Sequence, residues 1–162
     1  MPYIMTLVSL FTADSIIKSW IEKNWAANQT CKHRIVIKKY HNKGAMFNFC
    51  DKSQDLVAIL SLVLSAFVSG IFVAVLQRKG AHIQKTGLAL VLGGAYSNTY
   101  DRLKRKYVVD YFSVSIETKN MKNRFLQKLA NKINTMVFNL ADFGIMIGAI
   151  LFVMSEWNGG QE

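Results

Sequence analysis

Long uncharged runs alternate with basic segments along this chain. The clearest run is Leu56 to Leu76, 21 residues without a charge, which is long enough to cross the roughly 30 Å hydrocarbon core of a bilayer as a helix. Residues 86–100 form a second uncharged run, and Lys85 can lengthen it by extending its ammonium group to the interface. Apolar segments with a few charges lie near both ends. The pattern predicts four transmembrane helices, at about 3–22, 55–77, 83–100 and 136–157.

Shorter patterns lie between these helices. Ile35 and Ile37 alternate with polar residues before the turn-like sequence HNKGA, which predicts a short strand or hairpin resting on the membrane surface. Residues 121–137 place apolar side chains four apart and basic ones on other faces, as in an amphipathic helix at the membrane interface. An ordinary helix packed on the loop region is the alternative. The apolar positions are Met121, Phe125, Leu129, Ile133 and Val137.

Composition supports one membrane domain. The 162 residues leave room for a single domain, 1–162, and 51% of them are hydrophobic, with a mean hydropathy of +0.18. The first helix does not resemble a removable signal peptide, because no basic residue precedes it and its apolar run ends at Asp14 without a small-residue cleavage site. We therefore expect a multi-pass membrane protein with its first helix retained.

The net charge of +10 is unevenly distributed. Residues 23–52 hold seven Lys and Arg, and residues 101–137 hold nine. The positive-inside rule would place both segments in the cytoplasm. Without a nucleic-acid-binding motif we expect no nucleic-acid partner, and the phospholipids of an anionic membrane surface account for the charge better.

Cys31 and Cys50 are 19 positions apart in one hydrophilic segment. Two free thiols or one disulfide are both compatible with this spacing. The chain has no CxxC motif and no clustered histidines, so we expect no metal site and no cofactor.

Three aspartates lie near the ends of the last two predicted spans: Asp101, Asp110 and Asp142. Two carboxylates in one desolvated site share a proton near neutral pH, and such a pair can activate water as base while its protonated partner polarises a peptide carbonyl. Asp101 precedes Arg102, which can compensate its charge, so Asp110 is the better partner for Asp142. A structural ion pair or helix cap is the alternative for each of them.

Five short motifs occur in a characteristic order: ADSIIK, NKGAMF, GGAYSNTYDR, VVDY and FNLAD. Together, over residues 13–150, they make the chain resemble the lipoprotein signal peptidase (signal peptidase II) family. The resemblance implies a membrane all-α fold, a four-helix bundle with a small extracytoplasmic β-cradle. It also implies an aspartic endopeptidase that cleaves diacylglyceryl-modified prolipoproteins just before the lipidated cysteine.

The resemblance also assigns residues. Asp110 and Asp142 match the catalytic aspartates. Other matches hold the substrate backbone or support the pair, namely Asn42, Asn98, Arg102, Asn139, Asp14, Lys18 and Asp101. Asp14 and Lys18, at i and i+4, share a helix face that points into the bundle. Gly44 fits a tight turn, and Gly93 and Gly94 let helices approach closely.

The chain departs from the family at two places. Ser97 stands where the family usually has glycine, and Asp110 and Asp142 are 32 positions apart, about a dozen more than usual in the family. The extra length is the basic amphipathic stretch, which could enlarge a lid-like extracytoplasmic helix or alter substrate choice.

The family's topology, in the bacterial cytoplasmic membrane, places the active site and both basic segments (about 23–54 and 101–135) outside. We adopt this orientation over the charge count, and we expect a monomer. Two other functions are a non-catalytic paralogue that binds lipoprotein signal sequences and a small ion or proton transporter using Asp14, Lys18 and Asp142.

Overall fold

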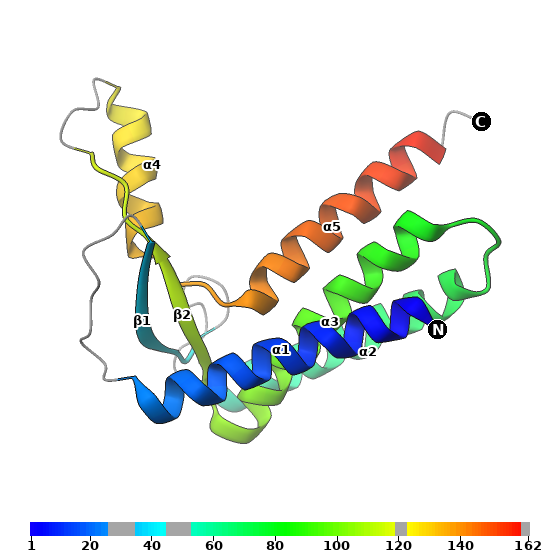
Figure 1. The fold of residues 1–162 in the computed structure, drawn as a ribbon, viewed down its shortest axis with the longest axis horizontal. Coiled ribbons are helices and arrows are strands. Elements are labelled where there is room, and N and C mark those ends of the chain that lie inside the picture. The colour runs from blue at the N-terminus through cyan, green and yellow to red at the C-terminus, as the bar shows by residue number, and fades with distance from the viewer. Residues whose placement is uncertain (26–34, 45–52, 119–122, 160–162) are drawn as a thin grey trace.

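The computed structural model describes residues 1–25, 35–44, 53–118 and 123–159, so Cys31, Cys50 and Met121 lie outside the described residues. The described residues are mainly helical (Figure 1). The elements in chain order are α1 (Pro2–Asn24), β1 (Ile35–Asn42), α2 (Gln54–Leu76), α3 (His82–Arg105), β2 (Val108–Val114), α4 (Arg124–Thr135) and α5 (Leu140–Gly159).

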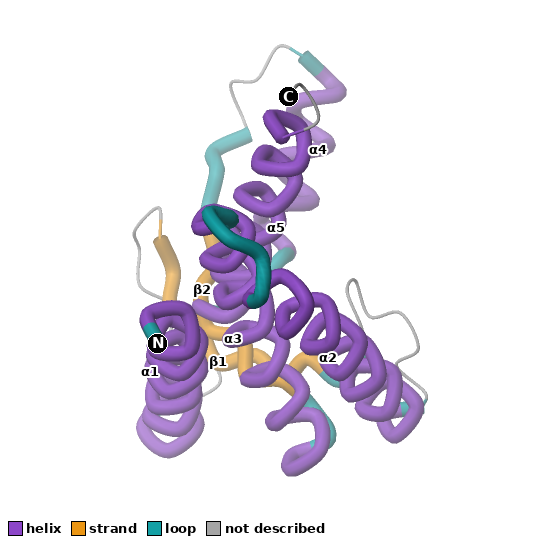
Figure 2. The backbone as a smooth tube through the Cα atoms, turned by 90° about the vertical axis from the view of Figure 1, so that its right-hand side faces the viewer, coloured by secondary structure: helices purple, strands orange, loops and turns teal. Residues whose placement is uncertain are grey.

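Helix α3 lies at the centre of the bundle, in contact with α1, α2 and α5 (Figure 2). Within the described residues, three helices are long and apolar enough to cross a membrane: α1, α2 and residues Leu140–Trp157 of α5. The remaining predicted span, 83–100, corresponds to α3, which has 24 residues but carries more polar side chains than these three helices. Its central position explains this composition, because protein rather than lipid covers much of its surface.

Small residues bring α3 and α5 together. A Cβ atom on Gly87 would lie 2.7 Å from the carbonyl oxygen of Gly148, and one on Gly94 would collide with the carbonyl oxygen of Ala141. These contacts confirm that the glycines of α3 permit close helix approach. The start of α5, which carries Asp142, is therefore held directly against α3.

The two strands form an antiparallel sheet at one end of the bundle. Asn42 is opposite Val108, and Tyr40 is opposite Asp110. The strand at Ile35 and Ile37 thus exists, but its partner in the described residues is β2 rather than the second arm of a local hairpin. Gly44 is buried at a bend that follows β1.

Two helix ends differ from the sequence prediction. Helix α3 continues to Arg105. The next residue, Lys106, takes a left-handed conformation (φ 68°), and its backbone N–H donates a hydrogen bond to the carbonyl of Arg102. Asp101 is therefore helical rather than part of a loop. Helix α5 begins at Leu140 rather than near residue 136, because Phe138 exchanges two 2.7 Å backbone hydrogen bonds with Phe112 of β2.

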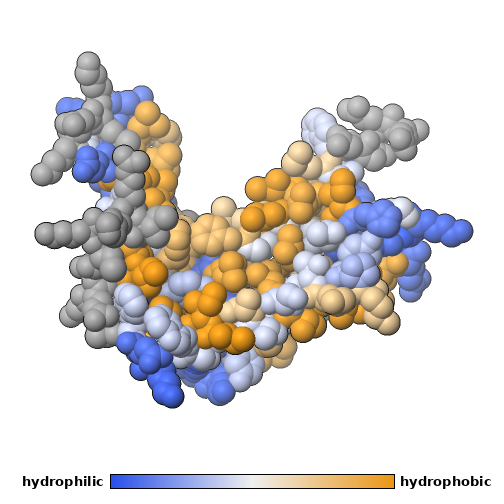
Figure 3. All heavy atoms as spheres, viewed as in Figure 1, coloured by the Kyte–Doolittle hydropathy of each residue, from blue (hydrophilic) through white to orange (hydrophobic). Residues whose placement is uncertain are grey.

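Helix α4 lies beyond the sheet, and its axis is steeply inclined to the bundle helices (Figure 1). It begins at Asn123, whose side chain accepts hydrogen bonds from the backbone N–H groups of Phe125 and Leu126. Phe125 is 72% exposed, and Leu126 and Leu129 are about half exposed. Apolar side chains line the side of α4 that faces α5 (Figure 3). The predicted amphipathic helix is thus present, within narrower bounds.

The α3–α5 contact predicts the effect of a single methyl group. Gly148→Ala would place its Cβ against the carbonyl of Gly87, so we expect a loss of about 1–3 kcal/mol in unfolding free energy. Gly70→Ala in α2 is the matched control, since nothing lies within 4 Å of its added Cβ and alanine favours the helix. Thermal unfolding in detergent should show a lower Tm for Gly148→Ala only; equal Tm values would contradict the tight contact.

Candidate active site

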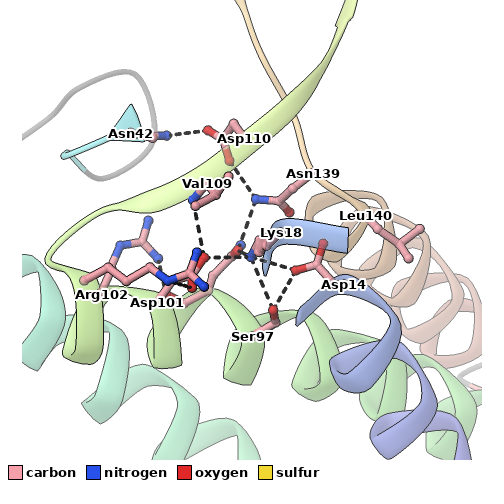
Figure 4. Close-up of polar contacts among 12 residues, drawn as sticks. Asp14, Lys18, Asn42, Ser97, Asp101, Arg102, Val109, Asp110, Asn139 and Leu140 are labelled. Carbon is pink, nitrogen blue, oxygen red and sulfur yellow. Dashed lines mark hydrogen bonds and ion pairs between the residues drawn. The ribbon is translucent and has the colours of Figure 1, made fainter. Parts of the chain in front are cut away.

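Polar side chains from α1, α3, the start of α5 and both strands meet at the sheet end of the bundle (Figure 4). The structure brings together the predicted residues of α1, α3, β1, β2 and α5 in one hydrogen-bonded network. The network has three parts: the Asp110 and Asp142 carboxylates, a group of asparagines around them, and a buried ion cluster centred on Lys18.

Asp110 lies in β2 and is 2% exposed. Its two oxygens accept hydrogen bonds from the amide nitrogens of Asn42 (3.0 Å) and Asn139 (2.7 Å). Burial raises the pKa of Asp110 from its ordinary value of 3.8 to about 7, and repulsion from Asp142 adds to the increase, against the two amide hydrogen bonds and the charge of Lys18. Asp110 can therefore hold a proton near neutral pH.

Asp142 is fixed by the start of its own helix. Its backbone N–H donates to Asn139 Oδ1 (2.9 Å), while its carboxylate accepts from the Asn139 backbone N–H (3.0 Å). This reciprocal pattern is a capping box, with Asn139 as the N-cap residue. Because Asn139 also donates to Asp110, one asparagine connects the two carboxylates. The structure thus brings together two aspartates that are 32 positions apart in the sequence.

Lys18 is almost fully buried and is surrounded by acceptors. Its ammonium lies 2.6 Å from Asp14 Oδ2 and 3.5 Å from Asp101 Oδ2, and it donates to Asn98 Oδ1 at 2.7 Å. The amide of Asn98 in turn donates to Asp142 (3.0 Å). The predicted Asp14–Lys18 pair is therefore connected to Asp142 through Asn98.

Asp101 belongs to the ion cluster rather than to the carboxylate pair. Its Oδ1 lies 3.5 Å from Arg105 Nε, and its Oδ2 accepts a hydrogen bond from the Val109 backbone N–H. Arg105, not Arg102 as the sequence suggested, is the arginine that pairs with Asp101. These partners leave Asp110 as the aspartate connected to Asp142.

Three polar atoms at this site are buried without a partner among the described residues: Asn42 Oδ1, Arg102 Nε and Arg105 Nη1. Unpaired buried polar atoms are costly. An acceptor on Asn42 and a donor on Arg102 are the groups that an extended peptide backbone can satisfy.

Sequence reasoning missed three contributors to this network: the Tyr111 hydroxyl, the Asn139–Asp142 capping box and the Ser97 hydroxyl. Tyr111 donates its hydroxyl to Asp14 (3.1 Å), although an aromatic residue in an apolar strand indicates only core packing. The sequence indicates the capping box by the pattern N-x-x-D at Asn139 and Asp142, directly before an apolar run. Ser97, the departure from the family glycine, donates to Asp14 (2.6 Å).

The raised pKa of Asp110 predicts a pH-dependent stability difference. The folded protein binds this proton more tightly than the unfolded chain, so wild-type stability falls as pH rises from about 3.8 to about 7. Asp110→Asn removes that titration. The Tm of the variant minus that of the wild type should therefore increase between pH 5 and pH 8 and level off above. A constant difference would contradict the assignment, and Asp55→Asn, at an 80% exposed side chain, is the control.

Comparison with known proteins gives a consistent result. A family model described as signal peptidase (SPase) II matches residues 6–158. The chain is 30% identical over 170 residues to the lipoprotein signal peptidase of Pseudomonas aeruginosa PAO1, covering 100% of this chain and 91% of that one. It is 28% identical over 156 residues to that of Clostridioides difficile 630, covering 93% of this chain and 90% of the other.

Two solved structures share the fold. A bacterial membrane enzyme solved by the in meso method at 2.3 Å superposes with a TM-score of 0.75 at 20% identity, over 97% of this chain and 88% of that one. A second, at 1.9 Å, gives a TM-score of 0.72 at 20% identity, over 95% and 91% of the two chains. With the family model matching nearly its whole length, the chain belongs to the signal peptidase II family.

Proposed function

We propose that Asp110 and Asp142 act as a catalytic dyad that activates water for peptide-bond cleavage. As a member of the signal peptidase II family, the chain is a membrane aspartic protease that removes signal peptides from prolipoproteins. The observation that carries the proposal is Asn139, which donates to Asp110 while capping the helix turn that holds Asp142. The proposed substrates carry a diacylglyceryl-modified cysteine directly after the cleaved bond.

The two aspartates have different roles in the proposed reaction. Asp110, with a pKa of about 7, holds the shared proton, and ionised Asp142 removes a proton from the attacking water. Asp110 donates its proton to the scissile carbonyl oxygen as the water oxygen bonds to the carbonyl carbon. When the C–N bond breaks, the proton taken by Asp142 passes to the leaving amine, and one hydroxyl of the tetrahedral gem-diol returns its proton to Asp110 as the carbonyl re-forms.

Substrate backbone contacts are assigned to two of the atoms that lack a partner in the described part of the chain. Asn42 Oδ1 is proposed to accept a substrate N–H, and Arg102 Nε to donate to a substrate carbonyl. Asn98 and Asn139 are already bonded to the dyad, so we assign them to its support. Gly44, buried at the bend after β1, would keep Asn42 in place.

The dyad is tested by cleavage of a diacylglyceryl-modified prolipoprotein. Asp110→Asn and Asp142→Asn should each lower kcat/KM by about 10²–10⁴-fold, the usual contribution of general acid–base catalysis. Asp55→Asn, at an exposed residue paired with Lys106, should retain wild-type activity. Full cleavage by either dyad variant would refute the assignment, and wild-type protein that binds precursors without cleaving them would favour the non-catalytic paralogue.

The proposed membrane arrangement has four spans, with α3 as the fourth, in a single domain of the bacterial cytoplasmic membrane. The active site then faces the extracytoplasmic side, where a translocated precursor presents its cleavage site. Part of the positive charge of the two basic segments has structural partners and needs no cytoplasmic location: Lys39 pairs with Glu22, Arg105 with Asp101, and Lys106 with Asp55. One copy supplies the whole dyad, in keeping with a monomer.

Helix α4 is proposed to lie on the outer membrane surface. Its Phe125, Leu126 and Leu129 are exposed, apolar side chains line the side of α4 that faces α5 (Figure 3), and Arg124 and Lys128 are exposed as well. This combination suits an interface of phospholipids with anionic headgroups. The helix would then be parallel to the membrane, across the end of the bundle.

Brominated lipids test this location. With the three native tryptophans replaced by Phe, Phe125→Trp should be strongly quenched by lipids brominated in the acyl chain. Asn131→Trp, at an exposed polar position of the same helix, should be quenched weakly. Equal quenching of both tryptophans would show that α4 does not rest its apolar side on the bilayer.

A further inference from the structure

One hydroxyl group connects three elements behind the dyad. Tyr111 of β2 donates its hydroxyl to Asp14 Oδ1 of α1 (3.1 Å). The same oxygen accepts the backbone N–H of Leu140, the first residue of α5, at 2.9 Å. The oxygen therefore uses both its donor and an acceptor position.

The direction of these bonds is determined by charge. Burial and the negative charge of Asp14 raise the pKa of Tyr111, so the phenol stays protonated and donates to the carboxylate. Its lone pairs remain for the Leu140 N–H, one of the N–H groups that a helix leaves without an intrahelical partner.

The start of α5 is held at three successive residues. The carbonyl of Phe138 accepts the backbone N–H of Tyr111 (2.9 Å), the side chain of Asn139 donates to Asp110, and the N–H of Leu140 donates to the Tyr111 hydroxyl. Asp110 and Tyr111 are adjacent in β2 and contact different partners. Strand β2 thus holds the first turn of α5 at two places. Asp110 accepts a hydrogen bond from Asn139, and Tyr111 accepts one from Leu140.

We propose that Tyr111 is a positioning residue, whose hydroxyl fixes the first turn of α5 against Asp14 and so sets the placement of Asp142 relative to Asp110. This inference rests on the proposed dyad. Tyr111 does not touch the dyad oxygens, and it acts through Leu140 and Asn139. The tyrosine ring packs with Ile21 and Val109 in a small apolar cluster, so removing only the hydroxyl leaves the packing intact.

Tyr111→Phe removes the hydroxyl alone. We expect kcat to fall about 10- to 100-fold with little change in KM, because a displaced reacting group lowers the rate of the chemical step more than substrate binding. The matched control is Tyr96→Phe, which removes a hydroxyl bonded to Ser69 on the α2–α3 contact and should leave kcat unchanged. Wild-type kcat in folded Tyr111→Phe would overturn the proposal.

A second variant removes the donor of the hydrogen bond between Leu140 and Tyr111. Leu140→Pro removes the N–H at the first position of α5, where proline is tolerated, and should lower kcat similarly. If both variants break one hydrogen bond, the double variant should lose no more activity than the more impaired single variant. Additive losses would overturn the proposal, since Tyr111 would then act without Leu140.

These results are separable from a failure of the dyad itself. If Asp110→Asn is inactive while Tyr111→Phe cleaves at the wild-type rate, only the positioning role is overturned. If Asp110→Asn cleaves normally, the dyad assignment fails irrespective of Tyr111. Infrared titration of the Asp110 carboxyl, identified by its loss in Asp110→Asn, should show an altered pKa in Tyr111→Phe, which a purely structural role would not produce.

Discussion

The buried ammonium of Lys18 is the constraint on which the polar end of the bundle depends. A lysine can only donate hydrogen bonds, so Asn98 must present its oxygen to Lys18 and consequently its NH₂ group to Asp142. The Nδ2 of Asn139 likewise faces the oxygen of Asn98 as well as Asp110. A single buried cation thereby orients two amides, and these amides orient both carboxylates. Uncompensated, the cation would cost several kcal/mol, which explains why Asp14 and Asp101 flank it.

This arrangement separates the carboxylates that have cationic partners from those of the proposed dyad. Asp14 and Asp101 have cationic partners in Lys18 and Arg105, whereas the hydrogen bonds of Asp110 come from neutral amides. Neutral donors stabilise a carboxylate less than a cation does. Four aspartates in one small region therefore differ in what they can do: one pair neutralises charge and fixes geometry, and the other can share a proton.

The sequence predicted the helices and the aspartate pair because both leave strong signals, in uncharged runs and in ordered motifs. It did not predict the start of α5, since the backbone pairing of Phe138 with Phe112 is a tertiary contact between distant segments. The sequence did not indicate the proposed role of Tyr111 either. Its hydroxyl contacts Asp14 and Leu140 only when α1, β2 and α5 are packed together. Arg105 was missed as the partner of Asp101 because the predicted helix ended too early.

The long segment between the two aspartates need not disturb the dyad. Phe112 and Phe138 hydrogen-bond to each other, so residues 113–137 leave and return at one fixed point, and the dyad aspartates lie outside this closed loop. Lengthening such a loop costs little, about 0.6 kcal/mol for each doubling. The side-chain amide of Asn134 makes two hydrogen bonds to the backbone of Ile116, which ties α4 to the segment that follows β2. The additional residues between Phe112 and Phe138 therefore form a surface element. The geometry of the proposed dyad depends instead on the Phe112–Phe138 bridge, the Asn139–Asp142 capping box and the ion cluster around Lys18.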